Sequence, residues 1–155
     1  MRRPAINPRR KDQLGMLRAR VELVSKTQPS ILDLRKKLLD IGGEEIVALP
    51  PESGLDPFVP ILAELGEVMP YAVKFRQMEA SRCHYNVERL IREKKLGAMG
   101  TGYCLSDDGL WRNHSWGLKQ TRNRLVIIET TVPREIYFGV PVPRETLVAC
   151  GVNGH

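Results

Sequence analysis

The sequence predicts an α+β domain in which N-terminal helices are followed by an antiparallel β-meander. Up to Gly97, apolar residues recur at helical spacing between residues that start and stop helices. After Gly100, short runs rich in Val, Ile, Tyr, Trp and Thr alternate with turn residues, which is typical of strands. The chain has 155 residues, which fits one domain, 1–155, and is enough to bury a core.

The first predicted helices lie in a helical N-terminal segment, 12–43. Apolar residues at helical spacing predict a helix over about 12–26, namely Leu14, Leu17, Val21 and Val24. A second helix should begin at Ser30, because Asp33 follows three residues later as in a capping box. The pair Gly42-Gly43 should end it.

A proline-containing connector leads to the predicted α+β core, 56–155. Asp56-Pro57 is typical of an N-cap followed by a first helical residue, and Gly66 should end this short helix. Residues 68–75 are a candidate strand, which Pro70 weakens.

Ser81 is the predicted N-cap of the next helix, which should run to about Leu96. Strands are predicted at 101–106, 110–118, 124–131, 135–140 and 145–150. Asp107-Asp108-Gly109 predicts a tight turn, and loops join the other strands in chain order.

The net charge of +6 is concentrated at the N-terminus. Residues 1–40 carry 11 Lys or Arg and 4 Asp or Glu, whereas residues 41–155 carry 13 and 14. Residues 1–11 are predicted to form a flexible basic arm that is solvated, since no aromatic side chain is interleaved there to stack on bases. The alternative is an arm that contacts nucleic acid or an acidic partner through Arg2, Arg3, Arg9, Arg10 and Lys11.

Cysteine usage and hydropathy indicate a cytoplasmic protein. Cys83, Cys104 and Cys150 form no C-x-x-C pair, and an odd, sparse set argues against a disulfide framework. No apolar run approaches the length of a membrane span, so no membrane contact is expected. The basic N-terminus is not followed by the apolar stretch of a secretory signal.

Cys83 is the candidate nucleophile. It falls in the first turn of its predicted helix, where unpaired N–H groups and the helix dipole favour a thiolate. It shares a helix face with Val87, Leu90 and Ile91, so the thiol should point at the sheet. The same spacing also fits a small buried side chain without chemistry.

His114 and Glu129 are the candidate base and its orienter. If Leu118 pairs with Leu125 in an unbulged hairpin, His114 lies directly opposite Glu129, whose carboxylate can hold one ring nitrogen. The other nitrogen is then free to take a proton from Cys83. The alternatives are a surface His–Glu pair, or a bulge that turns Glu129 to the other face.

Other residues are secondary candidates. The Gln77 amide N–H can donate a hydrogen bond to an oxyanion beside the helix start. The candidates for lining a substrate pocket are Trp116, Trp111 and Asn86. His84 points about 100° away from Cys83 around the helix, so it is not the base. A zinc site from Cys83, His114 and Cys104 lacks the close ligand spacing of such sites, and no metal or other cofactor is predicted.

The order of these residues resembles the papain-like cysteine hydrolase superfamily, and most closely its transglutaminase-like branch. There a strand reading H-[AS]-W is followed by an acid and a threonine, as in His114-Ser115-Trp116 and Glu129-Thr130-Thr131. Gln77 matches the oxyanion glutamine of the papain branch. The likeness covers roughly 77–131; it departs in having Glu instead of Asp and in lacking the Gly-Cys of papain. The stretch is also similar to small bacterial and phage proteins, which implies no function.

The resemblance implies a papain-like core with the Cys83 helix packed on the sheet. It also implies a thiol hydrolase or acyl-transfer enzyme that acts on a peptide or a small amide or ester. In that interpretation Cys83 attacks the carbonyl, His114 transfers protons and Glu129 orients His114. The alternative function is a non-catalytic binding protein on the same scaffold, which uses the basic arm.

Overall fold

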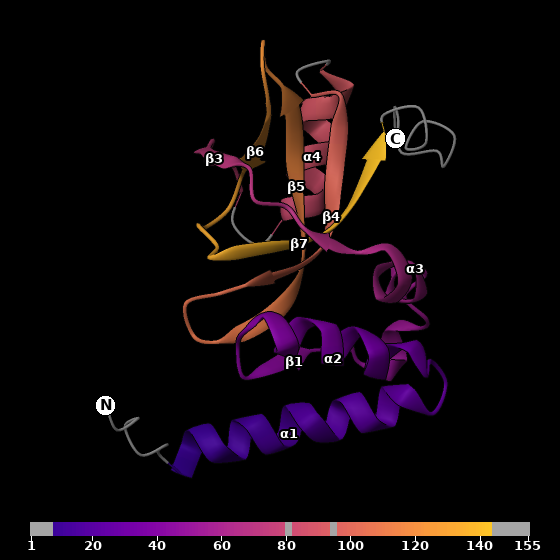
Figure 1. Ribbon diagram of the computed structural model, residues 1–155. Helices are drawn as coiled ribbons and strands as arrows, with labels where there is room; N and C mark the ends of the chain where they lie inside the picture. The colour runs from indigo at the N-terminus through magenta and orange to yellow at the C-terminus, as the bar shows by residue number, and fades with distance from the viewer. Residues whose placement is uncertain (1–7, 80–81, 94–95, 144–155) are drawn as a thin grey trace.

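The computed structural model describes residues 8–79, 82–93 and 96–143, which form an α+β fold (Figure 1). Within these residues four α-helices accompany a seven-stranded, mostly antiparallel sheet. The helices are α1 (Pro8–Ser25), α2 (Ser30–Ile41), the 3-10 turn η1 (Pro51–Ser53), α3 (Phe58–Leu65) and α4 (Cys83–Arg92). The strands are β1 (Glu45–Val47), β2 (Glu67–Val68), β3 (Ala72–Phe75), β4 (Ala98–Leu105), β5 (Leu110–Gln120), β6 (Leu125–Glu129) and β7 (Ile136–Pro143).

Helix starts differ from the prediction in four places. Pro57, and not Asp56, is the N-cap of α3, which begins at Phe58. Residues 8–11 belong to α1 and not to a loose arm, and Arg10 pairs with Glu44 at 2.7 Å. Pro29 is the N-cap of α2 and no side chain caps it, so the predicted capping box at Ser30 is wrong. Arg82, and not Ser81, is the N-cap of α4.

The pairing of the strands is not the predicted meander. Strand β7 returns past β5 and pairs with β4, which gives the order β2-β7-β4-β5-β6-β3. Strands β1 and β3 join β5 and β6 in parallel. The candidate strand at 68–75 is divided into β2 and β3, with Pro70 between them. The predicted strand at 145–150 lies outside the described residues.

The helices cover one face of the sheet. Helices α1 to α3 bury residues such as Leu34 and Leu62 against Tyr103 and Phe138, and α4 buries Val87, Leu90 and Ile91 with other residues in a second cluster. The opposite face carries Trp116, Leu118, Ile127 and Tyr137. Among the described helices none is long and apolar enough to cross a membrane.

Strand β5 has an interrupted edge. One edge pairs with β4 over the whole length of β4. The other edge pairs with β1 at 110–112 and with β6 at 117–120, so its ladder is broken at 113–116. At this break the Ser115 N–H has no partner in β1 or β6 and interacts instead with Cys83 in the first turn of α4.

Candidate active site

The β5–β6 hairpin is two residues out of its predicted register. Leu118 pairs with Ile127 instead of Leu125. Strand β5 continues to Gln120, and a tight turn follows, in which the Thr121 N–H donates to the Arg124 carbonyl at 2.8 Å. His114 is therefore not directly opposite Glu129. A slip of two residues nevertheless keeps every side chain on its face, because side chains alternate with a period of two.

The shifted register still brings His114 to Glu129, now along a diagonal. His114 Nε2 lies 2.7 Å from Glu129 Oε1. Both side chains are buried, with 2% and 0% of their surface exposed. A surface His–Glu pair is thus excluded, and the ring nitrogen that remains free of Glu129 is Nδ1.

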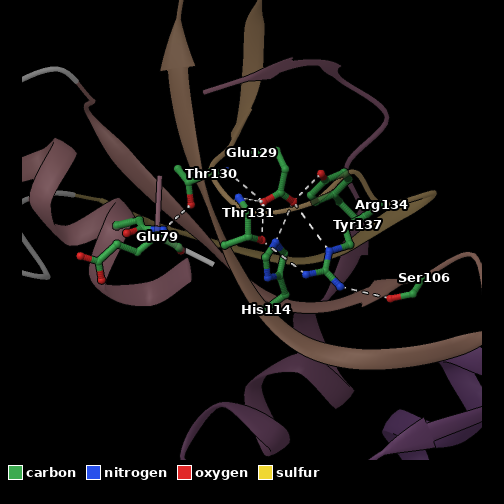
Figure 2. Close-up of polar contacts among 9 residues, drawn as sticks. Glu79, Ser106, His114, Glu129, Thr130, Thr131, Arg134 and Tyr137 are labelled. Atoms are coloured by element: carbon green, nitrogen blue, oxygen red, sulfur yellow. Dashed lines mark hydrogen bonds and ion pairs between the residues drawn. The ribbon is translucent and has the colours of Figure 1, made fainter. Parts of the chain in front are cut away.

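The Glu129 carboxylate lies at the centre of a polar cluster (Figure 2). Oε1 accepts from the Tyr137 hydroxyl at 2.8 Å, and Arg134 Nε lies 3.9 Å away. Oε2 accepts from the N–H groups of Thr130 at 2.9 Å and Thr131 at 3.0 Å, and from the Thr131 hydroxyl at 3.2 Å. A buried charge with this many donors is compensated where it lies.

These donors keep Glu129 ionised. Burial by itself would raise the pKa of Glu129, but the hydrogen bonds from His114, Thr131 and Tyr137 hold this pKa below its ordinary value. The carboxylate is therefore a fixed anion that orients the His114 ring.

Cys83 lies at the break in the β5 ladder. It is the first residue of α4 and is partly buried. Its sulfur interacts with the His114 ring and with the backbone N–H groups of Ser115 and His84, and all three lower the pKa of the thiol. Because α4 covers one face and His114 belongs to the other, the two side chains meet at the open edge of β5.

The charges of Cys83 and His114 support each other. Burial alone would raise the pKa of the Cys83 thiol, but His114 and the two N–H groups bring that pKa below its ordinary value. Burial alone would lower the pKa of His114, but Cys83 and Glu129 raise it. The arrangement favours a thiolate beside an imidazolium, which is the reactive form of a cysteine nucleophile.

Four of the predicted residues do not join this site. Gln77 is exposed and lines a surface depression with Arg89 and Glu93, far along α4 from its first turn. Trp111 is buried on the helical side, where its Nε1 donates to the Gly42 carbonyl at 2.8 Å. Asn86 is buried and ties α4 to Glu79 and Thr130.

Trp116 packs beside the site without lining an open pocket. It is fully buried and meets Tyr137 edge-on, with 5.1 Å between the two ring centroids. Its ring centroid lies 6.1 Å from that of His114. Gly100 and Gly139 make room for its indole, since a Cβ at either would lie within 2.8 Å of the ring. Trp116 therefore shields the His114 side of the cluster from water.

Three residues of the site were not predicted from the sequence, Thr131, Arg134 and Tyr137. Thr131 is the second residue after the end of β6, where a carboxylate side chain readily accepts from the next backbone N–H groups. Arg134 and Tyr137 reach Glu129 from the β7 side, and only the pairing of β7 with β4 brings them there.

Cys104, the other cysteine in the described residues, is buried. Burial and the nearby charge of Glu129 raise the pKa of Cys104 well above its ordinary value, so this thiol stays protonated and inert. Cys150 lies outside the described residues, as do Arg2 and Arg3. In the described part of the chain, no three His, Cys, Asp or Glu side chains are grouped to hold a metal ion.

Comparisons with protein-family models, with curated proteins and with solved structures find no match to this chain.

Proposed function

We propose that this protein is a thiol hydrolase or acyl-transfer enzyme that cleaves an amide or ester through Cys83, His114 and Glu129. One observation carries the proposal: a buried, ionised Glu129 holds His114 Nε2 at 2.7 Å, and the same ring lowers the pKa of the Cys83 thiol. A structural cysteine needs neither a base nor an orienter for the base. A papain-like ancestry agrees with this order of residues.

In the first half-reaction the Cys83 thiolate attacks the substrate carbonyl carbon. The new C–S bond forms while the carbonyl π electrons move to oxygen. The Cys83 N–H is suited to stabilise that oxyanion, because the first N–H groups of a helix have no partner within the helix. The oxyanion collapses, the bond to the amine or alcohol breaks, and the His114 imidazolium gives its Nδ1 proton to the leaving group.

In the second half-reaction the thioester is resolved. His114, now neutral, takes a proton from water or from an amine as it attacks the thioester carbonyl. The C–S bond breaks and the thiolate of Cys83 is restored beside a protonated His114. Glu129 keeps its charge throughout and fixes the ring orientation. A free thiolate of this kind suits a reducing compartment such as the cytoplasm.

The alternative, a basic arm that binds nucleic acid, has less support. Arg10 is bound to Glu44 and to the Asp108 carbonyl, so this side chain is engaged within the fold. Deletion of residues 1–7 tests the remaining arm, because salt-dependent retention on DNA or RNA should then fall if the arm is a binding element.

The proposed nucleophile is tested by alkylation with iodoacetamide followed by peptide mass mapping. At about pH 6, Cys83 should react much faster than Cys104, because the pKa of Cys83 is lowered and that of Cys104 is raised. His114→Gln should slow Cys83 and leave Cys104 unchanged. If Cys83 reacts only after denaturation, the proposal is wrong.

A further inference from the structure

A pocket of about 310 Å³ lies where the helical segment meets the sheet. Its walls are mainly apolar and come from the ends of α1 and α3, from α2 and from the connector after β1; among them are Val24, Ile31, Leu49, Leu55 and Val59. Four polar side chains interrupt these walls, Thr27, Gln28, Asp56 and Tyr103. An apolar pocket with a few convergent polar groups is typical of ligand sites, and this volume lies at the small end of their range.

Strand β5 links the polar end of the pocket to the first turn of α4. At the polar end of the pocket, Asn113 Nδ2 lies 3.5 Å from Asp56 Oδ2. Two residues on, Ser115 contacts the first turn of α4: its hydroxyl lies 3.4 Å from His84 Nδ1, and its N–H reaches Cys83. Same-face residues two apart on a strand are separated by roughly 7 Å. A substrate held at Cys83 can therefore extend one side chain toward Asp56.

Asp56 is a carboxylate without a cation. Its Oδ1 accepts from the Phe58 N–H at 2.9 Å, and Oδ2 faces Asn113. Gln28 Nε2 donates to its backbone carbonyl at 2.6 Å and fixes the loop. In the described residues no Lys or Arg side chain forms an ion pair with Asp56, in contrast to Glu44, Glu45 and Asp108, each of which has an arginine.

We propose that this pocket binds a substrate side chain that is aliphatic and ends in a cation, with the cation on Asp56 and the chain against the apolar walls. The inference rests on the proposed function and adds its substrate class. Gln28, Tyr103 and Asn113, which are all neutral, are also polar groups at this end. A partly buried carboxylate among neutral groups gives a cation a charge-assisted hydrogen bond that a neutral isostere cannot form.

The test uses chloroacetamides that carry a 5-aminopentyl, a pentyl or a 5-carboxypentyl group. The Cys83 thiolate displaces chloride, so one C–S bond forms and one C–Cl bond breaks. The aminopentyl probe should alkylate Cys83 about tenfold or more faster than the pentyl probe, with the carboxylate probe slowest. Asp56→Asn should abolish the preference. This substitution keeps Oδ1 as the acceptor for the Phe58 N–H, so the hydrogen bond at the start of α3 is retained.

Glu52→Gln is the matched control, because Glu52 is an exposed acid on neighbouring η1 that does not line the pocket. It should leave the aminopentyl preference unchanged. Equal rates for the three probes in the wild-type protein overturn the inference, and so does a preference that survives Asp56→Asn.

A second measurement separates this inference from the proposed function. In the Cys83→Ser variant, pentylamine should shift the amide resonances of Asp56 and Val59, and Asp56→Asn should remove those shifts. If iodoacetamide shows Cys83 to be unreactive but pentylamine binds, the enzymatic proposal fails and the cation site stands. If Cys83 is reactive and pentylamine shifts neither resonance, the cation site alone fails.

Discussion

Two buried glutamates, Glu45 and Glu129, differ in the basic side chain that binds each of them. Both are almost completely buried, at 1% and 0% exposure. Arg35 of α2 binds Glu45 through two hydrogen bonds of 2.8 Å each, whereas His114 binds Glu129 through one of 2.7 Å. Burial would raise the pKa of each carboxyl, and the partners lower it. Both therefore remain anions inside the protein.

The difference lies in the partner of each carboxylate. Arginine keeps its charge at every physiological pH, so the Arg35–Glu45 pair locks α2 to β1 and moves no proton. Histidine titrates and has a second nitrogen, which at His114 faces Cys83. Glu129 also accepts from neutral donors on β7 and at the end of β6, so its charge does not depend on His114 alone. A buried carboxylate becomes part of a reactive group when its cation can release a proton toward a nucleophile.

The largest expected effect comes from replacing each carboxylate by its amide. Glu45→Gln and Glu129→Gln should each lower the free energy of unfolding by about 3–5 kcal/mol, because each leaves buried donors without their anion. Urea unfolding followed by circular dichroism measures this loss. Only Glu129→Gln should also abolish the fast alkylation of Cys83. Loss of alkylation in folded Glu45→Gln would break the comparison.

A smaller effect is expected from Tyr137→Phe, which removes one neutral donor to Glu129. The free energy of unfolding should fall by about 1.5–3 kcal/mol, the usual range for a hydrogen bond to a charged group. The Tyr137 hydroxyl also lowers the pKa of Glu129, so acid unfolding should begin at a higher pH in the variant. An unchanged acid midpoint would show that the Thr130 and Thr131 N–H groups suffice.

How far the sequence predicts this site depends on whether local or distant residues decide it. The helix ends at Gly42 and Gly66 and the position of Cys83 at a helix start follow from nearby residues. The face shared by His114 and Glu129 also follows, because alternation survives a slip of two residues. The slip itself was not predictable, since it depends on how tightly the turn at 121–124 closes.

The parts that escape prediction depend on contacts between distant segments. Nothing near Tyr137 in the sequence indicates that β7 returns to β4, and therefore neither Tyr137 nor Arg134 was predicted at Glu129. Trp111 and Trp116 both suggested a substrate pocket, but each fills a core on a different face of β5. Residue type alone does not distinguish an aromatic side chain that lines a pocket from one that closes it.

The destabilisation caused by Glu129→Gln should change with pH, whereas the destabilisation caused by Glu45→Gln should not change on the alkaline side. The expected difference is on the order of 1 kcal/mol. Each carboxyl has a lowered folded pKa, so both contributions are present above the unfolded glutamate pKa and are lost as the pH falls through the folded value. His114 has a raised pKa, so its contribution is complete below the unfolded histidine pKa and is lost as the pH rises through the folded value.

The measurement is urea unfolding of the wild type and both amide variants, from a pH below the folded pKa of the glutamates to a pH above that of His114. The destabilisation by Glu129→Gln should shrink on the alkaline side, where His114 becomes neutral. The destabilisation by Glu45→Gln should stay constant there, because Arg35 does not titrate. Parallel alkaline curves for the two variants would mean that His114 is already neutral beside Glu129.

The smallest expected effect concerns Arg18, the second cation near Glu45. Its Nε lies 3.7 Å from Glu45 Oε1, but the side chain is 65% exposed. Exposed ion pairs contribute little because water screens them and the long side chain loses freedom. Arg18→Gln should therefore change the free energy of unfolding by less than about 1 kcal/mol. Arg134 lies at a similar 3.9 Å from Glu129 but is only 13% exposed and also bonds Ser106, so Arg134→Gln should cost clearly more. Equal losses from the two substitutions in urea unfolding would mean that burial does not decide the strength of these secondary pairs.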